Sequence, residues 1–328
     1  MKPWLYFSAL HADLCPGGRL PSGLIHAIFS VMRRLMALLL ALPALAAPPV
    51  SAAIDRGPVA TIAMIAEPLG IESLMGPGVD PHLYKLTRAD ITRLIEAPHL
   101  LYCGLGLEGK MLDAFERLAA SGKPATAVCE AVPEAKRLQA AAGYAGAADP
   151  HLWMDPALWA EALQVAADRL GMPAPDGFER LDAYARASME SIPAQARVLV
   201  TAHDAFAYFG RRYGLEVVGI QGVNTESEAG LRAIEAAVET VVARRLPAVF
   251  VESTVSDRNV RAIVEGAAAR GHRVAIGGRL FSDAMGPEGT YEGTYVGMID
   301  HNVTTIARAL GGIAPTRGMQ GRLRVHDR

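Results

Sequence analysis

Short runs of apolar, often β-branched residues alternate with helical patterns along most of this chain, and this alternation constrains the fold more than any other feature. The runs that we interpret as strands are VATIAM (59–64), HLLYC (99–103), ATAVC (125–129), VLVTA (198–202), EVVGI (216–220), AVFVE (248–252) and HRVAI (272–276). Strands that alternate with helices are typical of βα units, whose strands pair in parallel. The sequence therefore predicts an α/β protein with parallel sheets flanked by helices.

The helical patterns divide the chain into two α/β halves. The segments that we expect to be helical are 87–97, 107–120, 204–213, 226–244, 257–270 and 293–310. Thr87 and Asp90 resemble a capping box at the start of the first of these helices. Between the halves, residues 173–196 are expected to form one connecting helix with Asp176 as its N-cap. The predicted domains are an N-terminal lobe at 54–172, this connecting helix, and a C-terminal lobe at 197–328.

The N-terminal region has the pattern of a secretion signal. Residues 32–53 combine a basic start, an apolar run and small residues that suit signal-peptidase cleavage. Because a signal normally begins at its own methionine, we expect translation to start at Met32 and residues 1–31 to be an upstream segment that is not made. The apolar run is too short for a membrane-spanning helix. No cysteine directly follows it, so we predict a periplasmic protein without a lipid anchor.

Composition excludes one class of partner and leaves the state of the cysteines open. Over 328 residues the formal net charge is −2, and no Lys/Arg cluster is longer than a pair, so nothing favours nucleic-acid binding. Cys15 lies in the segment that we exclude from the mature protein. Cys103 and Cys129 remain, and in an oxidising compartment they form either a disulfide or two small buried thiols.

The chain repeats one short motif, Asp-Pro-His-Leu, which places a histidine at His82 and again at His151. Proline fixes its own φ angle and restricts the preceding aspartate, so each histidine follows a stiff backbone. Imidazole is a common metal ligand and must be held in one orientation to bind. A single histidine of this kind is more often structural, whereas two in matching turns favour a metal site.

Two further candidate ligands lie in the C-terminal half. His203 directly follows a predicted strand, at the end where open α/β sheets bind ligands, and Asp283 lies on the loop after the last predicted strand. Asp283 alone would be interpreted as a helix cap, but three imidazoles and one carboxylate form a four-coordinate set for a divalent ion. Glu252, at the end of another strand, is either a hydrogen-bond partner of this site or a buried acid paired with an arginine.

Some other residues receive a lesser role from their positions. His301, in the last predicted helix, is a weak candidate for an outer contact of the site. Three aromatic residues close in sequence to the ligands are expected to exclude water from the site rather than to react, namely Tyr84, Trp153 and Phe281.

The motifs GPGVDPHLYK, YCGLGLEGKM, DPHLWMDP, VTAHDAFAYFGRRYG, QGVNTESEAG and LFSDAMG resemble those of the zinc- and manganese-binding receptors of ABC importers, solute-binding protein family 9, over about 57–312. The resemblance implies two α/β lobes joined by a single long helix, with the metal in the interlobe cleft. It implies that His82 and His151 come from the first lobe, and His203 and Asp283 from the second. It also implies a monomeric receptor without enzymatic activity, whose partner is the membrane permease of an ABC importer.

The identity of the metal and two other functions stay open at this point. Three imidazoles favour Zn²⁺ over Mn²⁺, whereas the His- and acid-rich loop that many zinc receptors of this family carry is absent. A metal-sequestering or adhesion protein would use the same ligands. A zinc hydrolase with Glu252 as general base is disfavoured, because the sequence has no HExxH or HxxEH motif. Since a ligand histidine must be neutral, we expect affinity to fall below about pH 6.5.

Overall fold

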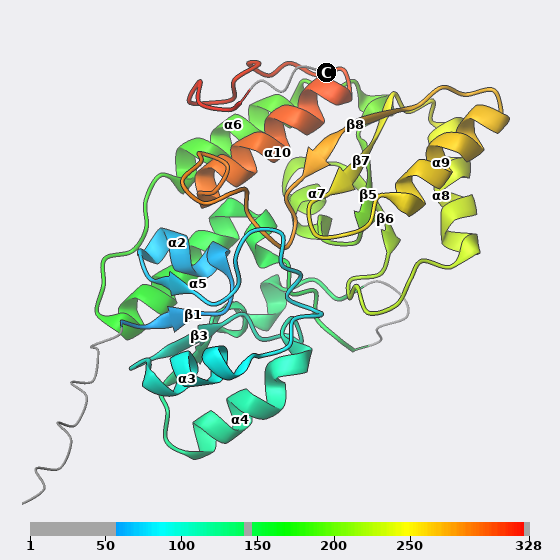
Figure 1. The fold of residues 1–328 in the computed structure, drawn as a ribbon. Coiled ribbons are helices and arrows are strands. Elements are labelled where there is room, and N and C mark those ends of the chain that lie inside the picture. The colour runs from blue at the N-terminus through cyan, green and yellow to red at the C-terminus, as the bar shows by residue number, and fades with distance from the viewer. Residues whose placement is uncertain (1–56, 141–145, 325–328) are drawn as a thin grey trace, which may run out of the picture. The chain divides into compact units, whose positions relative to one another are not determined.

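The computed structural model describes residues 57–140 and 146–324, which fold as a mixed α/β protein of two lobes (Figure 1). The predictions of a signal peptide at 32–53 and of an upstream segment at 1–31 lie outside the described residues. Within the described residues, no helix combines the length and the apolar character needed to cross a bilayer. We call the elements before the connecting helix the N-terminal lobe and those after it the C-terminal lobe.

The N-terminal lobe contains a four-stranded parallel sheet with the strand order β2-β1-β3-β4. Its strands are β1 (Val59–Ala60), β2 (Glu72–Ser73), β3 (Leu100–Tyr102) and β4 (Ala125–Ala127). The first predicted strand is too long, because the chain enters a helix at Ala63, and β2 was not predicted. Strands β1 and β2 have two residues each, which is too few to show an alternating pattern in the sequence.

Helices cover this sheet and lead to the second lobe. They are α2 (Ala63–Leu69), α3 (Arg88–Glu96), α4 (Leu112–Ala120) and α5 (Pro156–Leu170). The predicted capping box is confirmed, since the Thr87 hydroxyl accepts from the backbone N–H of Asp90 and the Asp90 carboxylate accepts from that of Thr87. The second predicted helix begins later than expected, because residues Gly109–Met111 form a short 3-10 helix and the α-helix starts only at Leu112.

The connecting helix is α6 (Phe178–Glu190), which packs against α5 and α10 (Tyr295–Ala309). It is shorter than the predicted 173–196. The prediction of Asp176 as its N-cap was wrong, because the capping position is Gly177 in a left-handed conformation with φ of 87°. Glycine adopts that conformation without the steric strain that a Cβ atom would introduce.

The C-terminal lobe contains two pairs of parallel strands, β5 with β6 and β7 with β8, and β5 also contacts β7. The strands are β5 (Val198–His203), β6 (Glu216–Gln221), β7 (Ala248–Glu252) and β8 (Ala275–Leu280). Its helices besides α10 are α7 (Ala207–Tyr213), α8 (Leu231–Ala243) and α9 (Arg258–Ala269). The last strand was predicted at 272–276, three residues before its true start.

Alternation along β5 separates two hydrophobic cores. Val198 and Val200 face the core formed with α8 and α9, which lie together on one side of the strands in Figure 1. Leu199 faces the larger core, which also includes residues of the N-terminal lobe, α6 and α10. Since side chains alternate between faces along a strand, His203 lies on the same face as Leu199, toward the N-terminal lobe.

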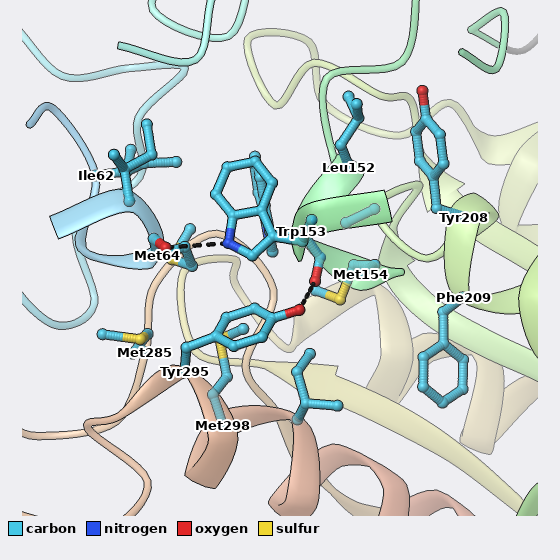
Figure 2. Close-up of a cluster of buried hydrophobic side chains, with 14 of the residues drawn as sticks. Ile62, Met64, Leu152, Trp153, Met154, Tyr208, Phe209, Met285, Tyr295 and Met298 are labelled. Carbon is cyan, nitrogen blue, oxygen red and sulfur yellow. Dashed lines mark hydrogen bonds between the residues drawn. The ribbon is translucent and has the colours of Figure 1, made fainter. Parts of the chain in front are cut away.

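The larger core is continuous between the two lobes. Trp153 of the N-terminal lobe and Tyr295 of α10 are both fully buried in it, and the Tyr295 hydroxyl donates to the Trp153 carbonyl at 2.8 Å (Figure 2). Met64, Met285 and other apolar side chains surround them. The lobes are therefore joined by shared apolar packing as well as by the connecting helix.

Candidate metal centre

The two Asp-Pro-His motifs form the same hydrogen-bonded turn. The backbone N–H of His82 donates to Asp80 Oδ1 at 2.8 Å, and that of His151 donates to Asp149 Oδ1 at 2.9 Å. An aspartate that accepts from the N–H two residues later forms an Asx turn, which fixes the backbone locally. The motif recurs because each copy presents one imidazole from a turn held at both its aspartate and its proline.

The other two candidate ligands come from the ends of strands in the C-terminal lobe. His203 is the last residue of β5, and Asp283 lies three residues beyond the end of β8. The indole N–H of Trp153 donates to the carbonyl of Ser282 at 2.8 Å. This bond joins the turn that carries His151 to the loop that carries Asp283.

The structure brings all four predicted ligands together, with one donor atom from each lying within 4.8 Å of the others. The Nε2 atoms of His82 and His151 are 3.4 Å apart. Asp283 oxygens lie 3.3 Å from His151 Nε2 and 3.2 Å from His203 Nε2, and 3.8 Å from His82 Nε2. A tetrahedral Zn²⁺ with bonds of about 2.0–2.1 Å requires ligand atoms roughly 3.3–3.4 Å apart. Most of the observed separations therefore fit such an ion.

Burial and hydrogen bonding at the cluster are also those of a cation site. All four residues are buried, with exposed fractions of 3% or less. Among the described residues, His203 Nε2 and both oxygens of Asp283 have no hydrogen-bond partner. Buried polar atoms are normally hydrogen-bonded, since an unsatisfied one is costly. A divalent ion among these atoms would satisfy all of them.

Carboxylates hold the far side of two of the imidazole rings. His151 Nδ1 lies 2.7 Å from Asp149 Oδ1, and His203 Nδ1 lies 2.5 Å from Glu252 Oε2. Glu252 reaches His203 because the two residues end the neighbouring strands β7 and β5 on the same face. Such partners fix the ring and leave Nε2 for the metal. Of the two roles predicted for Glu252, the structure shows the hydrogen-bond partner, here of the His203 ring. The contact between Asp149 and the His151 ring was not predicted.

The charges around the cluster determine how strongly protons compete for it. Burial lowers the pKa of His151, but neighbouring carboxylates overcome this effect and raise it to about 9. Burial also opposes protonation of His203, while Glu252 and Asp283 raise its pKa well above the usual value. Burial lowers the pKa of His82 to about 4. Burial raises the pKa of Asp283, but the neighbouring His203 and His151 lower it by more. The pKa of Asp283 therefore lies well below its usual value.

The residues with lesser predicted roles have the following contacts. The ring of His301 packs against Phe281, and its Nε2 lies 2.8 Å from the Arg279 carbonyl oxygen. Tyr84 donates its hydroxyl to Asp90 at the start of α3. Trp153 packs on a predicted ligand, with its ring centroid 5.2 Å from that of His151.

Cys103 and Cys129 form a disulfide, which decides between the two alternatives left open by the sequence. Both residues are fully buried. The Cys103 sulfur lies 3.4 Å from the carbonyl oxygen of Pro150, and the Cys129 sulfur lies 3.7 Å from the same oxygen. The disulfide therefore supports the turn that carries His151.

Two α/β lobes that enclose a buried cluster of three histidines and one aspartate define the class of metal-binding solute receptors. The chain belongs to the family described as zinc-uptake complex component A, periplasmic (ZnuA), whose model matches residues 59–309. This match confirms the resemblance seen in the sequence motifs.

Individual relatives agree with this assignment. The chain is 45% identical over 268 residues to the manganese-binding lipoprotein MntA of Bacillus subtilis, covering 76% of this chain and 87% of the relative. It is 44% identical over 283 residues to the zinc-binding protein TroA of Treponema pallidum, covering 79% and 91%. The solved structure of that periplasmic zinc-binding protein matches with a TM-score of 0.72 and 42% identity, covering 78% of this chain and 99% of the other.

Proposed function

We propose that this protein is an extracytoplasmic receptor that binds one divalent metal ion through His82, His151, His203 and Asp283 and delivers it to an ABC importer. The observation that carries the proposal is the convergence of four buried ligand groups, with one donor atom from each within 4.8 Å of the others. Each lobe contributes two of the ligands, so binding and release are coupled to the relative position of the lobes.

Zn²⁺ is the proposed ion, with Mn²⁺ as the alternative. Three imidazole nitrogens suit zinc, and zinc lies above manganese in the general order of affinity for such sites. Mn²⁺ prefers sites richer in oxygen, and in this cluster only Asp283 supplies oxygen atoms. The relatives include one named for zinc and one named for manganese, so family membership supports both ions.

The donor set favours transport over catalysis. A catalytic zinc ion usually has three protein ligands and keeps one position for water or substrate. Four protein ligands leave a tetrahedral ion without that position. Glu252, the general base of a hydrolase alternative, is committed to His203 through both its oxygens, which lie 2.8 Å from the backbone nitrogen and 2.5 Å from Nδ1. A sequestering protein remains the second use of the same site.

The proposed partner is the membrane permease of an ABC importer, and the proposed location is outside the cytoplasm. The family is described as the periplasmic component of a zinc-uptake complex. The disulfide between Cys103 and Cys129 is typical of an oxidising compartment. Zinc-dependent association of the purified receptor with its permease in lipid vesicles would separate transport from sequestration.

Metal titration tests this function directly. Purified protein is stripped of metal and titrated with Zn²⁺ and Mn²⁺ in competition with a chelator of known affinity, beside His203→Ala. His272→Ala is the matched control, because His272 lies in the same lobe and contacts the Leu246 carbonyl instead of the cluster. We expect one ion per chain, tight binding by the control and a large loss in His203→Ala. Equal affinity in the two variants would refute the site.

A further inference from the structure

The carboxylate of Asp80 contacts both lobes. Its Oδ1 atom accepts from the backbone N–H of His82 at 2.8 Å, within the N-terminal lobe. Its Oδ2 atom accepts from the Thr225 hydroxyl at 2.6 Å, and Thr225 lies 145 residues further along the chain in the C-terminal lobe. One side chain therefore joins a proposed metal ligand to the opposite lobe.

The matching aspartate of the second motif is used differently. Asp149 directs the same oxygen to the backbone and to the ring of His151, so both bonds stay within its own turn. Asp80 makes no contact of that kind with the His82 ring, and His82 Nδ1 has no hydrogen-bond partner among the described residues. The second oxygen of Asp80 is used for the other lobe instead.

Thr225 lies on a loop that is itself fixed to the metal-binding strands. This loop, residues 222–230, runs from the end of β6 to the start of α8. The side-chain amide of Gln221 donates to the carbonyls of Thr225 at 2.9 Å and Ser227 at 2.7 Å. Gln221 is paired with His203 across β5 and β6. The contacts thus form a continuous connection from His82 through Asp80 and the loop to His203.

A second contact between the lobes involves the next residue of the same loop. Lys110, in the short 3-10 helix Gly109–Met111 of the N-terminal lobe, forms an ion pair with Glu226. Both side chains are about two-fifths exposed, so salt screens this pair and it contributes little. Thr225 is buried, with 7% of its surface exposed. A hydrogen bond from a hydroxyl to a carboxylate at such a position is the stronger of the two contacts.

We propose that the Thr225–Asp80 hydrogen bond is a closing contact that holds the lobes together around the metal and thereby sets its rate of release. The inference rests on the proposed function as a metal receptor. The bond spans the two lobes and ends on the turn of His82, the proposed ligand whose Nδ1 atom has no hydrogen-bond partner among the described residues. Breaking it frees that turn from the C-terminal lobe, while the ligands themselves are unchanged.

Metal release from substituted proteins tests this inference. Protein loaded with Zn²⁺ is mixed with excess chelator in a stopped-flow instrument, and association is measured separately. Thr225→Val removes the hydroxyl at nearly constant volume, and we expect release to be about tenfold faster with association unchanged, because hydrogen bonds to charged groups contribute at least about a factor of ten. Thr225→Ser keeps the hydroxyl and is expected to release metal at the wild-type rate.

Thr240→Val is the matched control, since the Thr240 hydroxyl donates to the Ala236 carbonyl within α8. It should release metal at the wild-type rate. Thr225→Ala serves as the second variant if the valine variant does not fold. Release from Thr225→Val within twofold of wild type, or slower association with unchanged release, would overturn the inference. Wild-type protein that binds no metal would refute the proposed function itself, a result that is visible before any variant is compared.

Discussion

Removing the disulfide with Cys103→Ala and Cys129→Ala is expected to lower the free energy of unfolding by about 3.5 kcal/mol. The two cysteines are 26 residues apart in sequence. A cross-link over that distance restricts the unfolded chain, and the loop-entropy relation gives roughly 12 cal/mol/K, or about 3.5 kcal/mol at room temperature. That is a large part of the roughly 5–15 kcal/mol that stabilises a typical domain.

Urea denaturation followed by fluorescence measures this loss in wild-type and double-variant protein, both free of metal. Wild-type protein kept reduced during unfolding and refolding provides the matched comparison, because it lacks the cross-link but keeps both sulfur atoms. We expect the reduced protein and the double variant to lose similar amounts. A loss below about 1 kcal/mol in the reduced protein would refute the argument from chain entropy.

Three further predictions concern the site. Zn²⁺ affinity is expected to decrease as the pH falls below about 9, because the raised pKa of His151 keeps its imidazole protonated there. The decrease should reach up to about tenfold per pH unit for each proton that the metal displaces. Competitive titration between pH 9 and 7 checks this, and constant affinity would contradict it. Glu252→Gln is expected to weaken binding about tenfold to a hundredfold by releasing the His203 ring, whereas Glu239→Gln on the exposed face of α8 should leave affinity unchanged. Trp153→Phe leaves the Ser282 carbonyl without its donor and should cost about 1–3 kcal/mol in urea denaturation, with no loss arguing against the bond.

The pH prediction replaces the value that the sequence alone suggested. An isolated imidazole loses its proton near pH 6.5, which was the basis of the first expectation. In the folded protein, the carboxylates that orient His151 and His203 also stabilise their protonated forms. A metal ion must displace those protons, so competition extends to higher pH than the composition of the ligand set indicates.

The strands show where sequence patterns succeed and where they fail. Strand β7 was predicted with its observed bounds, because AVFVE has four apolar residues, two of them β-branched, before its final glutamate. Strand β8 was placed too early because its true sequence, AIGGRL, contains two glycines that indicate a loop. A Cβ atom at Gly277 would lie 2.7 Å from the Cβ of Ala309 in α10 and 2.8 Å from the Phe250 ring. The glycines are needed for close packing, which only the folded structure reveals.

The four candidate ligands could be selected from the sequence because each follows a local pattern, either Asp-Pro-His or the end of a strand. The hydrogen-bond partners around these residues could not be predicted in the same way. The bond between Asp149 and the His151 ring depends on a rotamer, and the Thr225–Asp80 bond depends on the approach of two segments that are 145 residues apart. Nothing in the local sequence distinguishes the aspartate of the first motif from that of the second, although the structure uses them differently.

The shared core limits how a metal ion bound at the proposed site could leave. Trp153 and Tyr295 are fully buried between the lobes, and exposing a large apolar side chain costs about 1.5–3 kcal/mol each. Wide separation would expose several such residues and break the Trp153–Ser282 bond as well. A smaller movement that breaks the Thr225–Asp80 bond and withdraws His82 leaves that core intact. Carboxylates hold Nδ1 of His151 and of His203, whereas Nδ1 of His82 has no hydrogen-bond partner among the described residues. We therefore expect His82 to be the first proposed ligand to leave a bound ion.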